Sequence, residues 1–134
     1  MASNYSNVIS LLSADEVVAI NTTQTMVNVI NAKISYFSER TRFKHLFLYV
    51  KGTHASCSKA LTFYFQVSPD GVNWHDLSAI SVTLSGTDVI VNSDTHVALD
   101  LGEINYIRLA RVTNAETDAG YTATVNAFLG SKID

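Results

Sequence analysis

Charged residues are scarce in this chain. They make up 16% of its 134 residues, whereas hydrophobic residues make up 47%, and a globular domain usually carries about 25% charged residues. Neutral polar side chains such as Ser, Thr and Asn cover a surface but do little to prevent association. The deficit leaves two interpretations, a monomer with a neutral polar surface or a subunit partly buried against other chains, and we favour the subunit.

Cysteine and long apolar runs are also scarce. Cys57 is the only cysteine, so the chain forms no internal disulfide and nothing indicates an oxidising compartment. The apolar runs are strand-sized, far short of the roughly 20 residues that a membrane-spanning helix needs, and the first residues lack the pattern of a signal peptide. We therefore expect a soluble protein without a membrane partner, folded as a single domain over residues 1–134.

Clusters of basic residues are absent as well. The net charge is −3, from 9 Lys and Arg against 12 Asp and Glu, and the densest basic stretch is 39–45, where Arg40, Arg42 and Lys44 alternate with other residues. A nucleic-acid interface needs clustered cations that release counterions from phosphates. We interpret the stretch as a solvated rim or an edge strand, and we expect no nucleic-acid partner.

No motif for catalysis or metal binding is present. The sequence contains no G-x-S-x-G, no phosphate-binding glycine loop, no calcium loop and no HxH or HExxH spacing, the patterns that assemble a nucleophile, a phosphate cradle or a metal site. Cys57 lies among small polar residues rather than in a nucleophile motif. We expect no catalytic residue, no metal site and no cofactor. The four histidines stand on separate segments, at His45, His54, His75 and His96.

What the chain has instead is alternation of apolar and polar residues with a period of two, which predicts strands. The segment 43–52 is apolar on both faces, which is typical of a central strand covered twice. The other strong segments are 61–67, 105–114 and 120–130. Residues 13–20 carry a weak helix signal that β-branched residues oppose. Shorter strand candidates lie at 17–21, 25–31, 33–37, 79–85, 88–92 and 96–101.

Many short strands separated by turn residues indicate an all-β fold, an antiparallel β-sandwich or jelly roll with little or no helix. The apolar face of the strongest strands predicts the core. Its expected members are Leu61, Phe63, Phe65, Val67, Leu109, Val125 and Leu129. Residues 1–12, expected as an extended N-terminal arm, and the loop 52–59 are apolar or small enough to order on contact with a neighbouring chain.

The most distinctive stretch is a predicted hairpin turn that contains the only proline and the only tryptophan. Ser68 ends a strand, Pro69 fixes φ for the turn, Asp70 accepts backbone N–H groups and Gly71 tolerates positive φ. Trp74 follows closely, and we expect it to be substantially buried against the aromatic residues of the preceding strand. These properties explain the stretch as a structural hairpin without any ligand.

The pattern SPDG-x-x-W-x-D-L at 68–77 resembles a hairpin of small all-β virion proteins of tailed bacteriophages, including capsid decoration and tail-associated proteins. Segments similar to 105–114 and 120–130 follow the hairpin in those proteins, so the resemblance covers residues 61–130 and does not extend to residues 1–60. The same hairpin also occurs in unrelated sandwich domains that bind carbohydrate. The motif therefore indicates the fold more specifically than the role.

The resemblance implies a non-enzymatic structural subunit, assembled in the host cytoplasm into the virion. Its expected partners are other virion proteins, the major capsid protein above all, and further copies of itself. The residues expected in these contacts are Asn4, Tyr5, Val8, Ile9, Leu11, Leu12, Tyr64 and Tyr106.

The alternative is a carbohydrate-binding or receptor-binding module of a phage tail. Such a module would use aromatic side chains as platforms for sugars, and the candidates are Tyr64, Trp74, Tyr106 and Tyr121. Exposure separates the two hypotheses, because a sugar site needs aromatic faces open in a groove whereas an assembly subunit needs a flat patch that closes against a neighbour.

Overall fold

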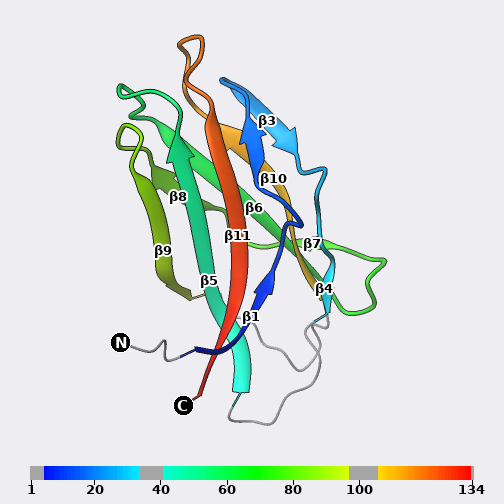
Figure 1. Ribbon diagram of the computed structural model, residues 1–134. Coiled ribbons are helices and arrows are strands. Elements are labelled where there is room, and N and C mark those ends of the chain that lie inside the picture. The colour runs from blue at the N-terminus through cyan, green and yellow to red at the C-terminus, as the bar shows by residue number, and fades with distance from the viewer. Residues whose placement is uncertain (1–4, 34–40, 97–105, 134) are drawn as a thin grey trace.

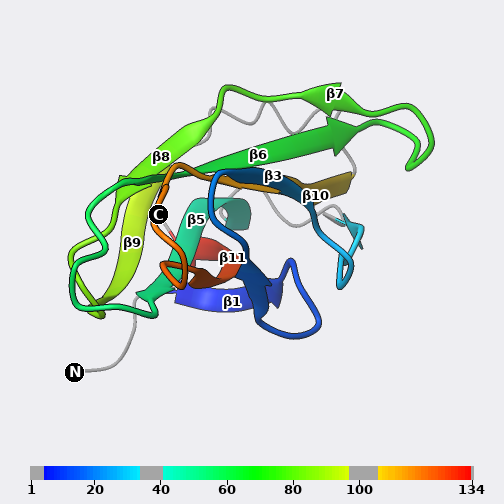
Figure 2. The same cartoon turned by 90° about the horizontal axis from the view of Figure 1, so that it is seen from above.

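A computed structural model describes residues 5–33, 41–96 and 106–133, and these residues form two antiparallel sheets packed as a sandwich (Figure 1). The described residues contain strands and no helix, as the alternation of residues predicted. Seen from above, the two sheets form separate layers (Figure 2). The all-β sandwich expected from the sequence is confirmed.

The first sheet has the order β1-β11-β5-β9, with β2 also paired to β11. Its strands are β1 (Tyr5–Ser10), β2 (Glu16–Val18), β5 (Thr41–Gly52), β9 (Val89–His96) and β11 (Ala123–Ile133). The second sheet has the order β3-β10-β6-β7, with β4 paired to β10 and β8 paired to β6. Its strands are β3 (Thr22–Thr25), β4 (Ala32–Lys33), β6 (Ala60–Ser68), β7 (His75–Asp76), β8 (Ile80–Thr83) and β10 (Tyr106–Asn114).

The core lies between the sheets and is built from the alternate residues of β5, β6, β10 and β11. All seven residues predicted for it are buried. In β6 the inward residues Leu61, Phe63, Phe65 and Val67 alternate with half-buried outward ones, because successive side chains of a strand point to opposite faces. The two phenylalanine rings stack with their centroids 6.4 Å apart.

The strand predicted over 25–31 is wrong beyond its first residue. β3 ends at Thr25, and between Met26 and β4 only Val29 forms an isolated bridge, to Leu12. The carboxylate of the buried Glu16 accepts the backbone N–H groups of Val27 and Asn28 at 2.9 to 3.1 Å, so these groups are not available for a strand ladder. The candidates 33–37 and 96–101 lie almost entirely outside the described residues.

Residues 5–12, the described part of the expected N-terminal arm, pair and pack within the domain. β1 pairs along β11, and the residues that follow it turn into the core, where Leu11 is 0% and Leu12 1% exposed. The physical reason is that these apolar side chains close one edge of the sandwich and are buried by doing so. Asn4 lies outside the described residues. Within the monomer, residues 5–12 belong to the domain itself.

The loop 52–59 is also folded onto its own chain rather than extended toward a neighbour. The Thr53 hydroxyl donates to the carbonyl of Thr122 at 2.7 Å, and the His54 ring stacks on Tyr121 with centroids 4.3 Å apart. Cys57, which lies among small polar residues in the sequence, is only 2% exposed and belongs to the core. This loop closes one end of the sandwich.

Candidate functional site

The SPDG hairpin satisfies its own polar groups. The Ser68 hydroxyl oxygen accepts the backbone N–H of Gly71 at 2.8 Å, and Asp70 Oδ1 accepts those of Val72 and Asn73 at 2.8 Å each. The side-chain amide of Asn73 donates to Asp70 Oδ2 at 2.7 Å. Gly71 has φ 78°, as predicted for this position. The turn that follows Pro69 is thus explained by local hydrogen bonding.

The Asp70 carboxylate makes the hairpin sensitive to acid. The backbone N–H groups of Asn73 and Val72, helped by the Asn73 amide, hold the pKa of Asp70 well below its usual range. A lowered folded-state pKa means that the charged form stabilises the fold above the unfolded-state pKa, about 3.9, and that this contribution is lost as the pH falls further.

We expect wild type to be more stable than Asp70→Asn at neutral pH, with the difference in the free energy of unfolding shrinking below about pH 4. Urea unfolding at a series of pH values measures it, and a difference independent of pH would contradict the assignment.

Trp74 has a different contact from the one predicted. It is partly buried and lies on the outer face of the second sheet, where its recorded ring contact is the Arg108 guanidinium, 4.0 Å from the ring centroid. Tyr64 has a similar partner, because the Arg111 guanidinium stands 4.4 Å from its centroid. A guanidinium over an aromatic face is attracted by the ring quadrupole. Each ring therefore has an arginine on one face, and that face is not open as a platform for a sugar.

A β-bulge in β10 brings the two arginines to the same face. Leu109 pairs with Phe65, and Arg111 pairs with Tyr64, the residue just before Phe65 in β6. Ala110 is therefore the extra residue of the bulge. Without the bulge, Arg111 would share the inward face of Leu109, because side chains three apart on a regular strand point to opposite faces. Simple alternation missed this placement.

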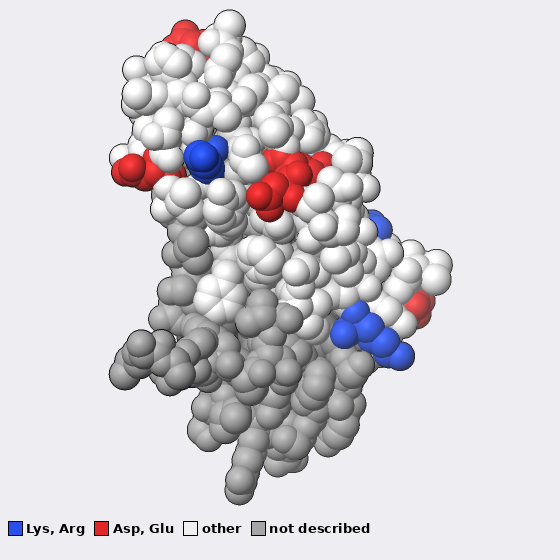
Figure 3. Space-filling view, in the orientation of Figure 1, with Lys and Arg blue, Asp and Glu red and all other residues white. Residues whose placement is uncertain are grey.

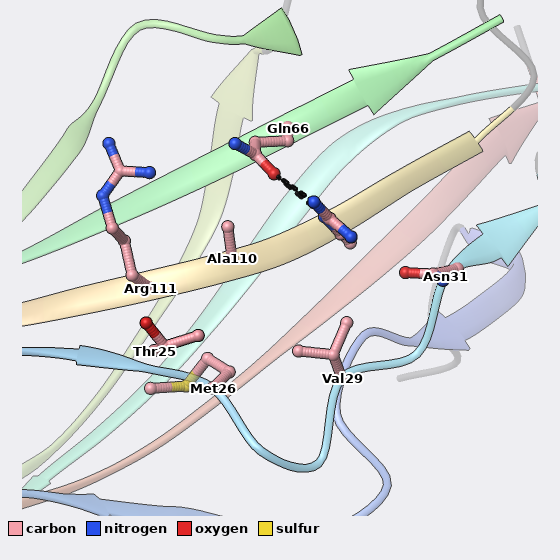
Figure 4. A pocket seen from close by; sticks show the side chains of 8 residues that line it. Thr25, Met26, Val29, Asn31, Gln66, Ala110 and Arg111 are labelled. Carbon is pink, nitrogen blue, oxygen red and sulfur yellow. Dashed lines mark hydrogen bonds between the residues drawn. The ribbon is translucent and has the colours of Figure 1, made fainter. Parts of the chain in front are cut away.

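The two arginines line a hollow of about 420 Å³ beside β10, here called the arginine hollow (Figure 4). It exists because β3 pairs with the residues from Arg111 onward and β4 with Tyr106 and Ile107, while the chain between these strands detours away from β10. The lining residues come from the end of β3, from this detour, from β6 and from β10: Thr25, Met26, Val29, Asn31, Gln66, Arg108, Ala110 and Arg111.

Hydrogen bonds fix the position of Arg108 in the hollow. Its Nε and Nη2 donate to Gln66 Oε1 at 2.9 and 2.7 Å, and the Gln66 amide nitrogen donates to Asp76 Oδ1 at 2.9 Å. Asp76 also lies 3.7 Å from Arg111 Nη1. Burial lowers the pKa of Arg108, yet an arginine stays charged at neutral pH. The arrangement is a fixed pair of cations with one nearby carboxylate.

The outer face of the first sheet carries a different kind of surface. Phe47 pairs with Phe128 and Tyr49 with Asn126 across β5 and β11, and Phe47, Tyr49 and Phe128, here called the aromatic face, are half-buried on the side away from the core. Figure 3 looks onto this sheet, and in its described part the charged atoms occupy a few separate spots with uncharged surface between them. Segment 43–52 was predicted to be covered on both faces; among the described residues, no further layer covers this one.

The residues expected in contacts do not gather in one place. Tyr5, Val8 and Ile9 lie in β1, and Ile9 packs against the core. Tyr64 and Tyr106 belong to the second sheet, on the opposite side of the sandwich, and Tyr106 packs near Gly71, since a Cβ placed there would lie 3.3 Å from its ring. Leu11 and Leu12 are buried and form no surface.

Among the described residues, no group of three or more His, Cys, Asp and Glu side chains is placed to hold a metal ion. Glu16 accepts backbone N–H groups as described above, and Glu116 does the same for Ser58 and Lys59. The register of β5 and β9 sets His45 opposite His96, a pairing that their separation in sequence did not suggest. The described residues include no helix long and apolar enough to cross a bilayer.

No protein-family model, curated protein or solved structure matches the chain.

Proposed function

We propose that this chain is a non-enzymatic structural subunit of a phage particle, which decorates the capsid by docking on the major capsid protein. The observation that carries the proposal is the aromatic face, formed by Phe47, Tyr49 and Phe128 on the outside of the first sheet. The outer face of an antiparallel sheet that borders water is normally polar. A row of aromatic side chains at this position instead favours contact with another protein.

Two further features support an assembled role. The chain has few charges to keep copies apart, and its SPDG hairpin, which resembles that of phage virion proteins, is a rigid turn with internally satisfied polar groups. A sandwich with rigid loops is a plate that changes little on docking. Many copies on one particle make weak individual contacts effective through avidity.

Replacing Tyr49 by Glu places a charge on the aromatic face and tests the docking surface directly. We expect wild-type protein to co-sediment with undecorated particles up to a fixed stoichiometry and to raise their resistance to heat. Tyr49→Glu should weaken this binding by at least about tenfold, because a charge buried in an apolar interface costs more than about 1.4 kcal/mol. Circular dichroism verifies that the variant is folded.

Tyr64→Glu is the matched control. Tyr64 is also a half-buried tyrosine on an outer face, but on the second sheet, and the new carboxylate would lie close to Arg111. We expect this variant to bind particles as wild type does. Loss of binding in Tyr64→Glu with retention in Tyr49→Glu would assign docking to the second sheet, and failure of wild type to bind any particle surface would overturn the proposal.

A carbohydrate-binding or receptor-binding module of a phage tail is the second candidate function. The aromatic platforms first expected for it are covered on one face by arginines in the cases of Tyr64 and Trp74. One observation still favours it, namely the arginine hollow on the second sheet. Saturable binding to a glycan without any binding to particles would favour this module.

A further inference from the structure

The arginine hollow has the charge and the form of a site for an anionic ligand. Two arginines line it, and none of its described lining residues is acidic. Gln66 takes up two donor positions of the Arg108 guanidinium, Nε and Nη2, and Arg111 Nη1 lies 3.7 Å from Asp76 Oδ1, which is longer than a hydrogen bond. Guanidinium groups keep further N–H donors for a ligand in such an arrangement, and their planar fork matches a carboxylate.

The two guanidinium groups are held in place before any ligand arrives. Arg108 lies over the Trp74 ring and is bonded to Gln66, whose own amide is oriented by Asp76. Arg111 lies over the Tyr64 ring. A side chain fixed in this way loses little conformational entropy on binding, which favours affinity. The aromatic rings thus act on a ligand through the arginines rather than as stacking platforms.

The rest of the lining suggests the chemical class of the ligand. Thr25, Asn31 and Gln66 supply hydroxyl and amide groups, while Met26, Val29 and Ala110 supply an apolar wall. A volume of about 420 Å³ is in the range of small-molecule sites. A simple inorganic anion needs no apolar wall, whereas a sugar ring has hydroxyl groups at its rim and apolar C–H faces.

We propose that the arginine hollow binds a sugar unit that carries a carboxylate, such as a uronic acid within a glycan. The carboxylate lies against Arg108 and Arg111, the hydroxyl groups bond to the polar lining residues, and one C–H face packs on the apolar wall. The inference goes beyond the particle-docking proposal and does not depend on it. The hollow and the aromatic face lie on opposite sides of the sandwich, so a subunit docked through the first sheet would present the hollow outward.

Nuclear magnetic resonance titration of the full chain with methyl glucuronide tests the proposal. Methyl glucoside is the matched probe, since it differs only in having a CH₂OH group in place of the carboxylate. We expect saturable shifts of the Arg108 and Arg111 Nε–H signals and of the Gln66 amide with the glucuronide, and binding at least about tenfold weaker with the glucoside, because the glucoside offers the guanidinium groups no charged acceptor.

Arg108→Gln and Arg111→Gln should each weaken glucuronide binding by about tenfold or more. Lys51→Gln is the control, since it removes the same charge from an exposed position on the first sheet and should leave the affinity unchanged. Equal binding of both sugars, or equal losses in all three variants, would overturn the proposal. Shifts at the arginines with an acidic peptide but not with the glucuronide would also overturn it and assign the hollow to a protein partner. Particle co-sedimentation is measured separately, so failure of either proposal is distinguishable from failure of the other.

Discussion

Phe65→Ala will lower the free energy of unfolding by about 3 to 5 kcal/mol, the usual loss when a fully buried aromatic side chain is truncated. Phe65 is 1% exposed, stacks with Phe63 and pairs across the sheet with Leu109. Truncation removes its contacts in the core between the two sheets and leaves a cavity. The surrounding strands relax only partly to fill such a cavity. The loss is measured by urea denaturation, as a lower midpoint with an unchanged slope.

Tyr64→Ala provides the control for this substitution. Tyr64 precedes Phe65 on the same strand but points outward, where its ring is half-buried beneath Arg111. Its truncation removes partly exposed area and a cation–π contact, and we expect a loss of about 1 kcal/mol. Equal losses in the two variants would show that β6 does not bury one face in solution.

Features governed by neighbouring residues in the chain were predictable from the sequence. The period-two pattern of β6 gave Phe63 and Phe65 as core residues because the alternation of side chains is a property of any strand. Asp70 and Gly71 were assigned correctly to the turn because Asp bonds to backbone N–H groups within a few residues and glycine accepts positive φ. Both inferences needed only local geometry.

Features that depend on contacts between distant segments were missed. Val27 leaves the predicted strand because a carboxylate eleven residues earlier, that of Glu16, takes its N–H. The outward position of Arg111 depends on a bulge at Ala110, which appears only in the register against β6. Trp74 was expected to pack on aromatic residues, yet its partner is Arg108, contributed by another strand. The arginine hollow follows from all these pairings and has no signature in a single segment.

Glu116 is another long-range feature, and it holds the loop 52–59 at one end of the sandwich. Glu116 is 2% exposed, and its Oε1 accepts the backbone N–H groups of Ser58 and Lys59 at 2.6 and 2.7 Å. The backbone N–H of Glu116 in turn donates to the side chain of Asn114, whose amide donates to the carbonyls of Val18 and Tyr121. One buried network therefore joins the loop 52–59 to β2 and β10.

Glu116→Ala will destabilise the fold by about 1 to 3 kcal/mol, because two hydrogen bonds that close the loop are lost and each contributes about 0.5 to 1.5 kcal/mol. Glu116→Gln keeps an oxygen that accepts the same two bonds, so we expect it to restore most of the loss. Asp118→Ala, which removes a carboxylate from an exposed position nearby, should change stability by less than about 0.5 kcal/mol. Urea denaturation compares the three variants. Equal destabilisation by Ala and Gln at Glu116 would show that the negative charge, rather than the acceptor oxygen, stabilises the loop.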